Sequence, residues 1–490
     1  MPKAPNILLV MADQHRADVL GCAGDPSALT PNLDRLASEG VRFSRVSCQG
    51  PLCMPARASF ITERYVRDHG VYTNWAEVDP DSPTYLEALR EAGYHTVQIG
   101  KAHLYRDEIA NAGHVDEMAP RLHALGFAEV HESGDKFCLS LPNAYTDMLE
   151  ARGLIDAYRQ HIADRSYQGD NETGRNPTKR FPMWDATPMP VPPDAYFDAW
   201  QGARALEWIE QYDRDQPFFA FVGFPGPHDP WDAPKEAVGR YAGVEMSRPR
   251  STRRPDLDDA GTYAGLLRAF QYVSDSETMT DDAIVGMRRA YSANVSVIDD
   301  AVGRMIDALD AKGELASTWI IYTSDHGEMA GDHGLMSKCV MYEGAVRVPL
   351  IVRPPAGRDP LVVDALVEHV DVPATLREVA SAPALPRSEG RSLLGYVNGA
   401  TPESREVSVS ENWGFAAFQT DRYKLVVDED ALAPCQLFDL HADHTEDDNR
   451  VRDPECAPVV EEMMETLVRP FFSTPPARPQ PSFFTGTPAS

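Results

Sequence analysis

Short apolar runs alternate along the chain with segments of helical periodicity. The runs that predict buried strands are residues 7–11, 96–99, 218–224, 319–322 and 348–352. Strands that alternate with helices are typical of a mostly parallel sheet covered on both faces. The chain is therefore expected to be an α/β protein with one large, mostly parallel sheet sandwiched by helices.

Helix start and stop signals support this alternation. Thr30 is the expected N-cap of a helix that has Pro31 in its first turn and ends at Gly40. Residues 82–93 repeat the same signals, and apolar residues at helical spacing over 295–309 predict a further helix. The order of elements is therefore a βα alternation.

Two domains and a tail are expected. Residues 1–375 predict the large α/β domain, with polar, proline-rich insertions near 160–195 and 230–280 around the mouth of a pocket. Residues 376–470 contain shorter strand-like runs and a final helix, which predict a smaller C-terminal α+β subdomain. The tail, 471–490, carries two phenylalanine pairs but cannot form a core of its own. We expect it to be disordered or to lie across another surface, and the two phenylalanine pairs are suited to an arm between subunits.

The composition is that of a globular protein with an excess of acidic side chains. Of the 490 residues, 43% are hydrophobic and 25% are charged, and the formal net charge is −29. This charge repels nucleic acid and anionic membrane surfaces, which excludes a general nucleic-acid binder. No apolar run approaches the ~18 residues of a membrane span and no signal-peptide core is present, so a cytoplasmic location is expected. Seven cysteines without a CxxC pair argue against a disulfide framework.

Side chains suited to metal binding or proton transfer directly follow four predicted strands. In strand order they are Asp13 with Gln14, Lys101 with His103, His228, and Asp325 with His326. Ligands of open α/β sheets bind at the carboxyl ends of the strands, so these side chains are expected to meet. The oxygen and imidazole donors of the first and fourth strands suit one divalent cation, with Mn²⁺ weakly favoured over Ca²⁺. A turn-capping role is the alternative interpretation of His326.

The segment from Cys53 to Arg57 is the most informative in the chain. Pro55 suits the first turn of a helix, so Cys53 is expected just before a helix N-terminus, where free N–H groups and the helix dipole favour an anion. Arg57 can point back to the same place with a planar group suited to a tetrahedral oxyanion. A buried, inert cysteine is the usual alternative, and the neighbouring Pro55 and Arg57 argue against it.

The motif Cys53-Met54-Pro55-Ala56-Arg57 resembles the C-x-P-x-R signature of type I sulfatases in the alkaline phosphatase superfamily. The resemblance extends over nearly the whole chain, through residues 6–14, 30–40, 53–65, 100–103, 227–228, 323–338, 342–352, 421–425 and 437–440. Gln14 and His326 are similar to the branch that contains phosphonate monoester hydrolases and some bacterial aryl and choline sulfatases. Lys101 and His103 are sulfatase-like, whereas phosphonate monoester hydrolases carry Tyr and Thr there.

The resemblance implies an alkaline phosphatase-like fold, a modified cysteine and one metal ion. Cys53 is implied to be oxidised to formylglycine by a formylglycine-generating enzyme and to supply the nucleophile. The implied ligands of one divalent metal, Mn²⁺ or Ca²⁺, are Asp13, Gln14, Asp325, His326 and the modified Cys53. Asp325 is also implied to take the proton of the nucleophile.

The resemblance also implies roles for the groups around the ester. The implied anion-binding groups are Arg57, Lys101 and Lys338, the implied donors to the leaving oxygen are His228 and Lys338, and the implied base of the final step is His103. Asn74, by its position in the family pattern, and Tyr105, which could face an aryl group, are the candidate substrate-binding residues, although a turn former and core packing are the alternatives.

The expected activity is hydrolysis of sulfate esters of the arylsulfatase type, with additional cleavage of phosphonate and phosphate esters. A phosphonate monoester hydrolase or phosphodiesterase with the same mechanism is the alternative that Gln14 and His326 support. A noncatalytic anion-binding protein on this fold is the alternative of another class, and the complete set of site residues argues against it. The expected partners are a small anionic ester and further copies of the chain, as a dimer or tetramer, without nucleic acid or membrane.

Overall fold

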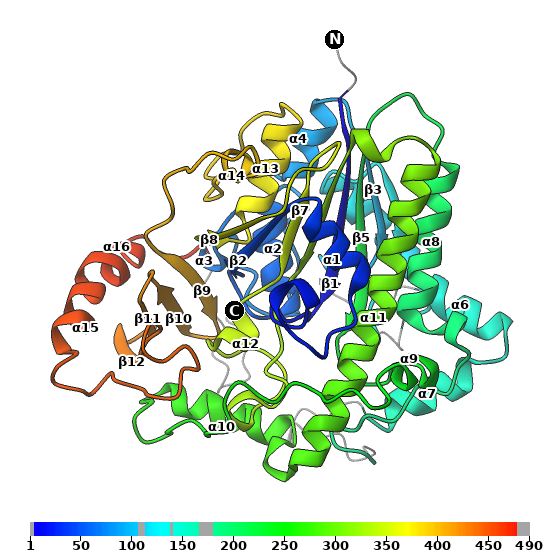
Figure 1. Cartoon of the computed structure of the whole chain (residues 1–490). Helices are drawn as coiled ribbons and strands as arrows, with labels where there is room; N and C mark the ends of the chain where they lie inside the picture. The colour runs from blue at the N-terminus through cyan, green and yellow to red at the C-terminus, as the bar shows by residue number, and fades with distance from the viewer. Residues whose placement is uncertain (1–3, 106–112, 138–140, 166–179, 478–490) are drawn as a thin grey trace.

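The computed structural model describes residues 4–105, 113–137, 141–165 and 180–477. An eight-stranded sheet in the order β4-β3-β5-β1-β6-β7-β2-β8 lies at its centre (Figure 1). Its strands are β1 (Asn6–Asp13), β2 (Val41–Ser47), β3 (His95–Gly100), β4 (Glu129–Glu132), β5 (Phe218–Pro227), β6 (Thr318–Ser324), β7 (Leu350–Arg353) and β8 (Leu361–Glu368). Strand β7 runs antiparallel to β6 and β2, and the remaining described pairs of this sheet are parallel. The expected mostly parallel α/β architecture is confirmed.

Helices cover both faces of the large sheet. Side chains alternate across a strand, so Leu8 and Val10 of β1 pack on one face while Leu9 and Met11 pack on the other. The first face carries α1 (Pro31–Ser38), α8 (Phe197–Gln211) and α11 (Asp281–Ala311), and the second carries α2 (Cys53–Thr62), α4 (Tyr85–Glu91), α5 (Ala119–Ala124) and α13 (Asp371–Val379). The central strand β1 is therefore buried over its whole length.

A second, smaller sheet forms most of the C-terminal subdomain. It is antiparallel, in the order β12-β11-β10-β9. Its strands are β9 (Ser408–Asn412), β10 (Phe415–Gln419), β11 (Tyr423–Asp428) and β12 (Ala433–Asp439). One face packs against α15 (Ala457–Met463) and the helical turn Met464–Val468, and the other packs against α10 (Tyr263–Val273). The expected smaller C-terminal α+β subdomain is confirmed, whereas Leu376, Leu393 and Val397 pack in the core of the large sheet.

The remaining helices are short and lie around these two sheets. They are α3 (Val66–His69), α6 (Ala144–Ala151), α7 (Ile155–Ala163), α9 (Lys235–Gly239), α12 (Glu343–Val346), α14 (Leu394–Val397) and α16 (Arg469–Phe471). The second proline-rich insertion contains α9 and α10, and α10 joins the core of the C-terminal sheet. Residues 166–179 of the first insertion lie outside the described residues. Among the described helices, none combines the length and the apolar surface needed to cross a membrane.

The capping residues and prolines in the sequence predicted α1 and α4, with one difference in each helix. Helix α1 begins at Pro31 after Thr30, but the Thr30 hydroxyl bonds to Asp34 and Gly21 and makes no capping bond to the helix backbone. Helix α4 begins two residues later than its proline suggests, because Thr84 forms a capping box with Glu87.

The first phenylalanine pair of the tail packs against the chain's own C-terminal subdomain. Phe471 and Phe472 contact Phe418 of β10, and the Arg67 guanidinium of α3 lies over both rings. The surface on which this pair lies is the outer face of β10, so the packing of these two rings needs no second subunit. The second pair, at 483–484, lies outside the described residues.

Candidate active site

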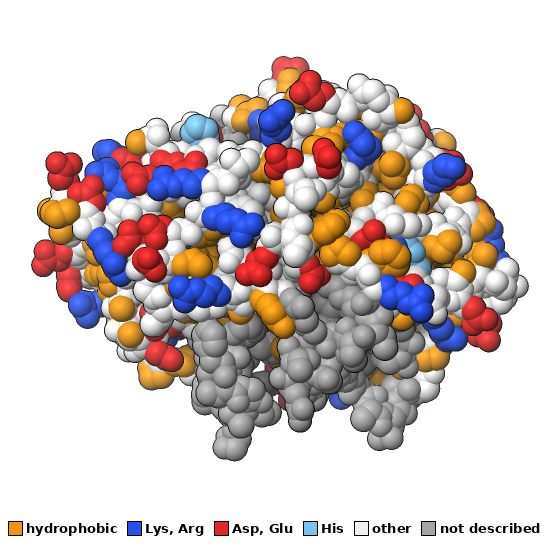
Figure 2. All heavy atoms as spheres, turned by 90° about the horizontal axis from the view of Figure 1, so that it is seen from below, with side chains coloured by type: hydrophobic (Ala, Val, Ile, Leu, Met, Phe, Trp, Pro, Cys, Tyr) orange, Lys and Arg blue, Asp and Glu red, His pale blue; other side chains and the backbone are white. Residues whose placement is uncertain are grey.

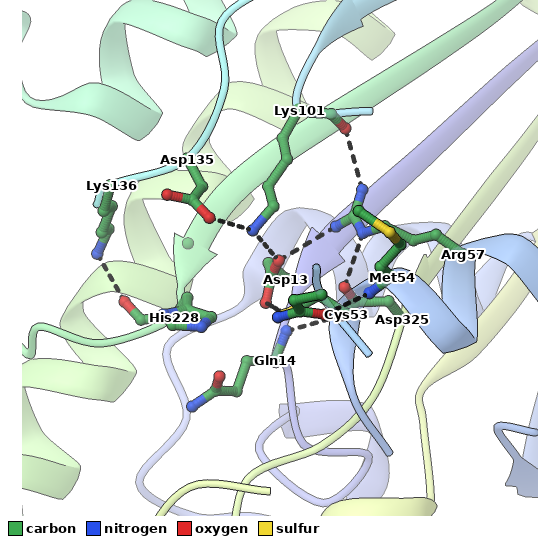
Figure 3. Close-up of polar contacts among 12 residues, drawn as sticks. Asp13, Gln14, Cys53, Met54, Arg57, Lys101, Asp135, Lys136, His228 and Asp325 are labelled. Carbon is green, nitrogen blue, oxygen red and sulfur yellow. Dashed lines mark hydrogen bonds and ion pairs between the residues drawn. The ribbon is translucent and has the colours of Figure 1, made fainter. Parts of the chain in front are cut away.

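The carboxyl ends of four neighbouring strands meet at one place. Asp13 ends β1, Lys101 follows β3, His228 follows β5, and Asp325 follows β6. These strands are neighbours in the order β3-β5-β1-β6, and each of the four side chains is at most 5% exposed. Figure 3 shows Lys101, His228 and Asp325 arranged around Asp13. The structure therefore brings together the side chains that strand ends alone predicted to meet.

Helix α2 presents its first residue, Cys53, to this cluster. The helix begins at Cys53 itself, with Leu52 as N-cap, rather than one residue later as expected. The Met54 N–H donates to the Asn74 Oδ1 atom over 3.0 Å, so Asn74 caps the helix from another segment. That hydrogen bond fixes the start of α2, and it uses the carbonyl oxygen of the candidate substrate-binding residue Asn74.

Arg57, one turn into α2, bonds to residues at the ends of three strands. Its Nε donates to Asp325 Oδ2 over 2.8 Å, its Nη1 donates to the Lys101 carbonyl oxygen over 3.0 Å, and its Nη2 lies 3.3 Å from Asp13 Oδ2. The side chain is 2% exposed. A rigid guanidinium with this many bonds holds its orientation, which fits a group that binds an oxyanion.

Four donor groups lie close enough to share one cation. Asp13, Cys53, Asp325 and His326 each offer an atom within 4.8 Å of the others, and all four are buried. The His326 Nδ1–H donates to the Gly327 carbonyl oxygen over 2.9 Å, so the Nε2 lone pair faces the cluster, 3.2 Å from the Cys53 sulfur. Two carboxylates and a neutral imidazole are suitable ligands for Mn²⁺ or Ca²⁺.

Neighbouring charges keep the two carboxylates of this cluster ionised. Burial opposes ionisation of Asp13, but Lys101 and the other cations hold its pKa well below the ordinary value. Burial and the Asp13 charge oppose ionisation of Asp325, but the Arg57 and Lys101 cations help to keep its pKa below the ordinary value. Burial lowers the pKa of His326 to about 4, so its imidazole is neutral. The protonation states are therefore those that a metal ion requires.

The thiol of Cys53 is a weak nucleophile in its unmodified form. Burial and the nearby Asp13 carboxylate raise its pKa to about 12. A thiol with this pKa is protonated at neutral pH, and only the thiolate is strongly nucleophilic. The surroundings therefore do not suit ordinary cysteine catalysis.

Gln14 turns away from the donor cluster. Its backbone N–H donates to Asp325 Oδ1 over 3.0 Å, whereas its side-chain oxygen accepts from Lys338 and its side-chain nitrogen donates to Glu328. Figure 3 shows the Gln14 amide pointing away from Cys53. Residue Gln14 also has a left-handed backbone, with φ of 70°, which is costly for a residue with a side chain. The structure thus places the Gln14 side chain beside the site, in contact with Lys338 and Glu328 rather than with the other proposed ligands.

Lys338 and His228 form a pair on the opposite side of the site from Arg57. The His228 Nδ1–H donates to the Asp229 carbonyl oxygen over 2.8 Å, and its Nε2 contacts the Lys338 Nζ. Burial and the Lys338 charge lower the pKa of His228. The Nε2 atom of a neutral imidazole can accept a hydrogen bond from the Lys338 ammonium, which joins the two side chains.

The two remaining predicted residues lie on the segment after β3. His103 is 5% exposed and has a left-handed backbone, with φ of 52°. Burial and the Lys101 charge lower its pKa to about 3, so it is present as a neutral base. Tyr105 is 2% exposed and belongs to the core cluster on the α2 face of the sheet. Its ring serves packing, which was the alternative to contact with an aryl group.

Comparison with known proteins places the chain in one family. The model of the sulfatase family matches residues 5–382, and the model of the C-terminal region of N-sulphoglucosamine sulphohydrolase matches residues 331–470. The chain belongs to the sulfatase family. Family members generally use a formylglycine and a divalent metal, and the cluster of Asp13, Cys53, Asp325 and His326 provides a possible metal site of this kind.

Relatives of this sulfatase-family chain cover nearly its whole length. It is 29% identical to a choline-sulfatase of Rhizobium meliloti (strain 1021), over 92% of this chain and 83% of the relative. It is 26% identical to an arylsulfatase of Clostridium perfringens (strain 13 / Type A), over 95% of this chain and 94% of the relative. The phosphonate monoester hydrolase of Agrobacterium radiobacter has a TM-score of 0.79 at 24% identity, over 96% of both chains, which shows a common fold. Family and relatives together support hydrolysis of sulfate esters.

The surface of this sulfatase-family chain offers no long-range attraction for an anionic ester. Figure 2 shows acidic and basic side chains interspersed over the described part of the side seen from below. The net charge of −29 also acts against an approaching anion. Binding therefore depends on short contacts with the buried cations of the site.

Two charged residues of this site were missed by sequence reasoning. Asp135 and Lys136 follow β4, a short strand that the apolar pattern did not predict. The Asp135 Oδ2 atom lies 3.3 Å from Lys101 Nζ, which is itself 2.6 Å from Asp13 Oδ2. The same rule of strand ends would have identified both residues had β4 been recognised.

Lys136 holds the loop that carries His228. Its buried Nζ lies 2.9 Å from the His228 carbonyl oxygen, 3.0 Å from Tyr196 Oη, 3.1 Å from Asn294 Oδ1 and 3.4 Å from Asp232 Oδ1. Figure 3 shows its bond to the His228 backbone. Since these groups come from three different elements, Lys136 fixes His228 relative to α8 and α11.

We expect Lys136→Met to weaken both folding and turnover. The change leaves Asp232 buried without its cation, which costs about 3 kcal/mol of unfolding free energy. It also frees the His228 backbone, and we expect kcat to fall about tenfold. Thermal unfolding and steady-state kinetics measure the two effects, with Lys235→Met on exposed α9 as the control. An unchanged melting temperature and kcat would show that Lys136 does not hold this loop.

Proposed function

We propose that this chain hydrolyses small aryl sulfates, that is, sulfate esters of phenols. The proposed nucleophile is Cys53 after its conversion to formylglycine, and the proposed cofactor is one divalent metal. The observation that carries the proposal is the position of Cys53. It is the first residue of α2 and lies among Asp13, Asp325 and His326, beside Arg57. A hydrated formylglycine at Cys53 would supply a nucleophilic hydroxyl, and a metal held by Asp13, Asp325 and His326 would lower its pKa and offset developing charge.

The cations on one side of Cys53 suit the nonbridging oxygens of the ester. Arg57 and Lys101 are buried and held in place by Asp13. Fixed donors in a site without bulk water stabilise developing charge strongly, because they need no reorganisation during the reaction. Asp325, which accepts from Arg57, is the proposed acceptor of the nucleophile's proton.

The pair of Lys338 and His228 suits protonation of the leaving oxygen. Lys338 contacts both Gln14 and His228, so its ammonium group has a fixed direction. General acid catalysis of this kind contributes about 10²–10⁴ in rate. His103, which is neutral and close to Lys101, is the proposed base of the final step.

A phosphonate monoester hydrolase is the second candidate function. It is supported by Gln14 and His326, which are similar to the branch that contains phosphonate monoester hydrolases. The same anion-binding groups accept a phosphonate monoester, which carries the same single charge as a sulfate monoester. We therefore expect measurable cleavage of phosphonate esters through the same nucleophile.

Paired substrates test this proposal. We expect kcat/KM to be higher for an aryl sulfate than for the matching aryl phosphonate ester. A phosphonate preference of more than about tenfold, equal to ~1.4 kcal/mol of transition-state stabilisation, would reverse the assignment. Turnover of neither ester by metal-loaded protein with converted Cys53 would favour a noncatalytic anion-binding protein.

A further inference from the structure

Asp135 is a carboxylate at the anion site to which the proposed reaction gives no role. It lies in the turn after β4, where its Oδ1 accepts from the Phe137 N–H over 2.8 Å. Its Oδ2 is 3.3 Å from Lys101 Nζ. Its side chain is 18% exposed, whereas that of Lys101 is 1% exposed, so Asp135 is the more accessible of the two.

The charge of Asp135 is permanent at neutral pH. Burial opposes ionisation, but the Lys101 ammonium outweighs it and holds the pKa of Asp135 well below its ordinary value. Figure 3 shows its carboxylate on the side of Lys101 that faces His228. The charge therefore lies between the proposed anion-binding group and the proposed leaving-group side.

The two carboxylates of the donor cluster differ from Asp135 in their surroundings. Asp13 and Asp325 belong to the donor cluster, and the Arg57 guanidinium contacts both. Asp135 lies outside that cluster, and a single ammonium group, Lys101 Nζ, separates it from Asp13. Its charge thus offsets part of the positive charge that Lys101 offers to a substrate, and Asp135 is not one of the proposed metal ligands.

We propose that Asp135 is a specificity-determining residue that makes the site select singly charged esters over doubly charged ones. The proposal rests on the proposed function and deepens it. A sulfate monoester carries one negative charge, whereas a phosphate monoester carries nearly two above its second pKa of about 6. A fixed carboxylate repels the second ester more strongly, because Coulomb repulsion rises with the charge of the ligand.

Asp135→Asn tests this selectivity. The amide retains the shape of the side chain and an acceptor for the Phe137 N–H, but it removes the charge. The substrates are p-nitrophenyl sulfate, p-nitrophenyl phenylphosphonate and p-nitrophenyl phosphate, assayed above the second pKa of the phosphate. We expect kcat/KM for the phosphate, relative to the sulfate, to rise about tenfold. The ratio of the phosphonate to the sulfate stays unchanged, because both carry one charge.

Controls separate this inference from the proposed function and from a folding defect. Asp147→Asn removes an exposed charge on α6 and is expected to leave both ratios unchanged. Asp135→Ser, a second uncharged variant, is expected to reproduce the shift of Asp135→Asn. A uniform fall for all three substrates, or an unchanged phosphate-to-sulfate ratio, would overturn the selectivity role while the unmodified enzyme still cleaves sulfate. Failure of the unmodified enzyme to cleave any sulfate would instead contradict the proposed function.

Discussion

Cys53→Ala is expected to lower the turnover of aryl sulfates by at least about 10⁴-fold. Removal of a nucleophile that acts together with its base and anion-binding groups lowers kcat by this much. The remaining cations still bind the ester but cannot cleave it. The fold should be preserved, because alanine occurs readily in the first turn of a helix and Cys53 makes no disulfide. Steady-state kinetics with a sensitive chromogenic ester measures the loss. The affinity for the uncleaved ester, measured directly rather than through KM, shows whether the site is intact.

A second buried cysteine provides the control for this variant. Cys456 lies at the start of α15 in the core of the C-terminal subdomain, away from the strand ends. Cys456→Ala is expected to keep near-normal kcat even if it lowers stability. Turnover by Cys53→Ala within tenfold of the unmodified enzyme would rule out Cys53 as the source of the nucleophile.

Asp325→Ala is expected to lose both bound metal and activity, the latter by at least about 10³-fold. Asp325 is a proposed metal ligand and the proposed acceptor of the nucleophile's proton, and it also orients Arg57 through a 2.8 Å bond. Removing it leaves the Arg57 charge buried without one of its partners, so some loss of stability is also expected. Metal content by elemental analysis and turnover are measured on the same dialysed sample.

The exposed Asp359 serves as the matched control for Asp325. Asp359→Ala removes a carboxylate at the opposite end of the large sheet, before β8, and should change neither metal content nor kcat. If Asp325→Ala retained stoichiometric metal and near-normal turnover, the assignment of the metal site would be wrong.

Strand ends were the part of the site that the sequence made predictable. A run such as 7–11 is continuous and apolar because β1 is buried on both faces, so its end and the following Asp13 can be found without a structure. The same holds for β5 and β6, which place His228 and Asp325. The motif at Cys53 could be found because Pro55 marks the start of a helix.

Strands with mixed exposure were not predictable in the same way. Strand β4 has three partly exposed residues out of four, and β8 alternates exposed and buried positions at its start. Strand β4 lacks an apolar run, and for this reason Asp135 and Lys136 were missed. Strand β2 was missed because Arg42 and Arg45 interrupt its apolar residues.

Contacts between segments that are distant in the sequence could not be predicted either. The spacing of Gln14 after β1 could not reveal that its amide meets Lys338 and Glu328, which are more than three hundred residues away. The packing of Phe471 on Phe418 likewise depends on the tertiary position of β10. Sequence patterns describe each element, whereas these contacts depend on how the elements assemble.

The mass of the peptide that contains Cys53 tests the central claim most directly. We expect enzyme made in a host with a formylglycine-generating enzyme to contain the aldehyde at Cys53, and the converted fraction to rise in proportion to specific activity across preparations. Peptide mass spectrometry and an aryl sulfate assay on the same samples measure both quantities. Fully active enzyme that contains only the unmodified Cys53 thiol would contradict the account.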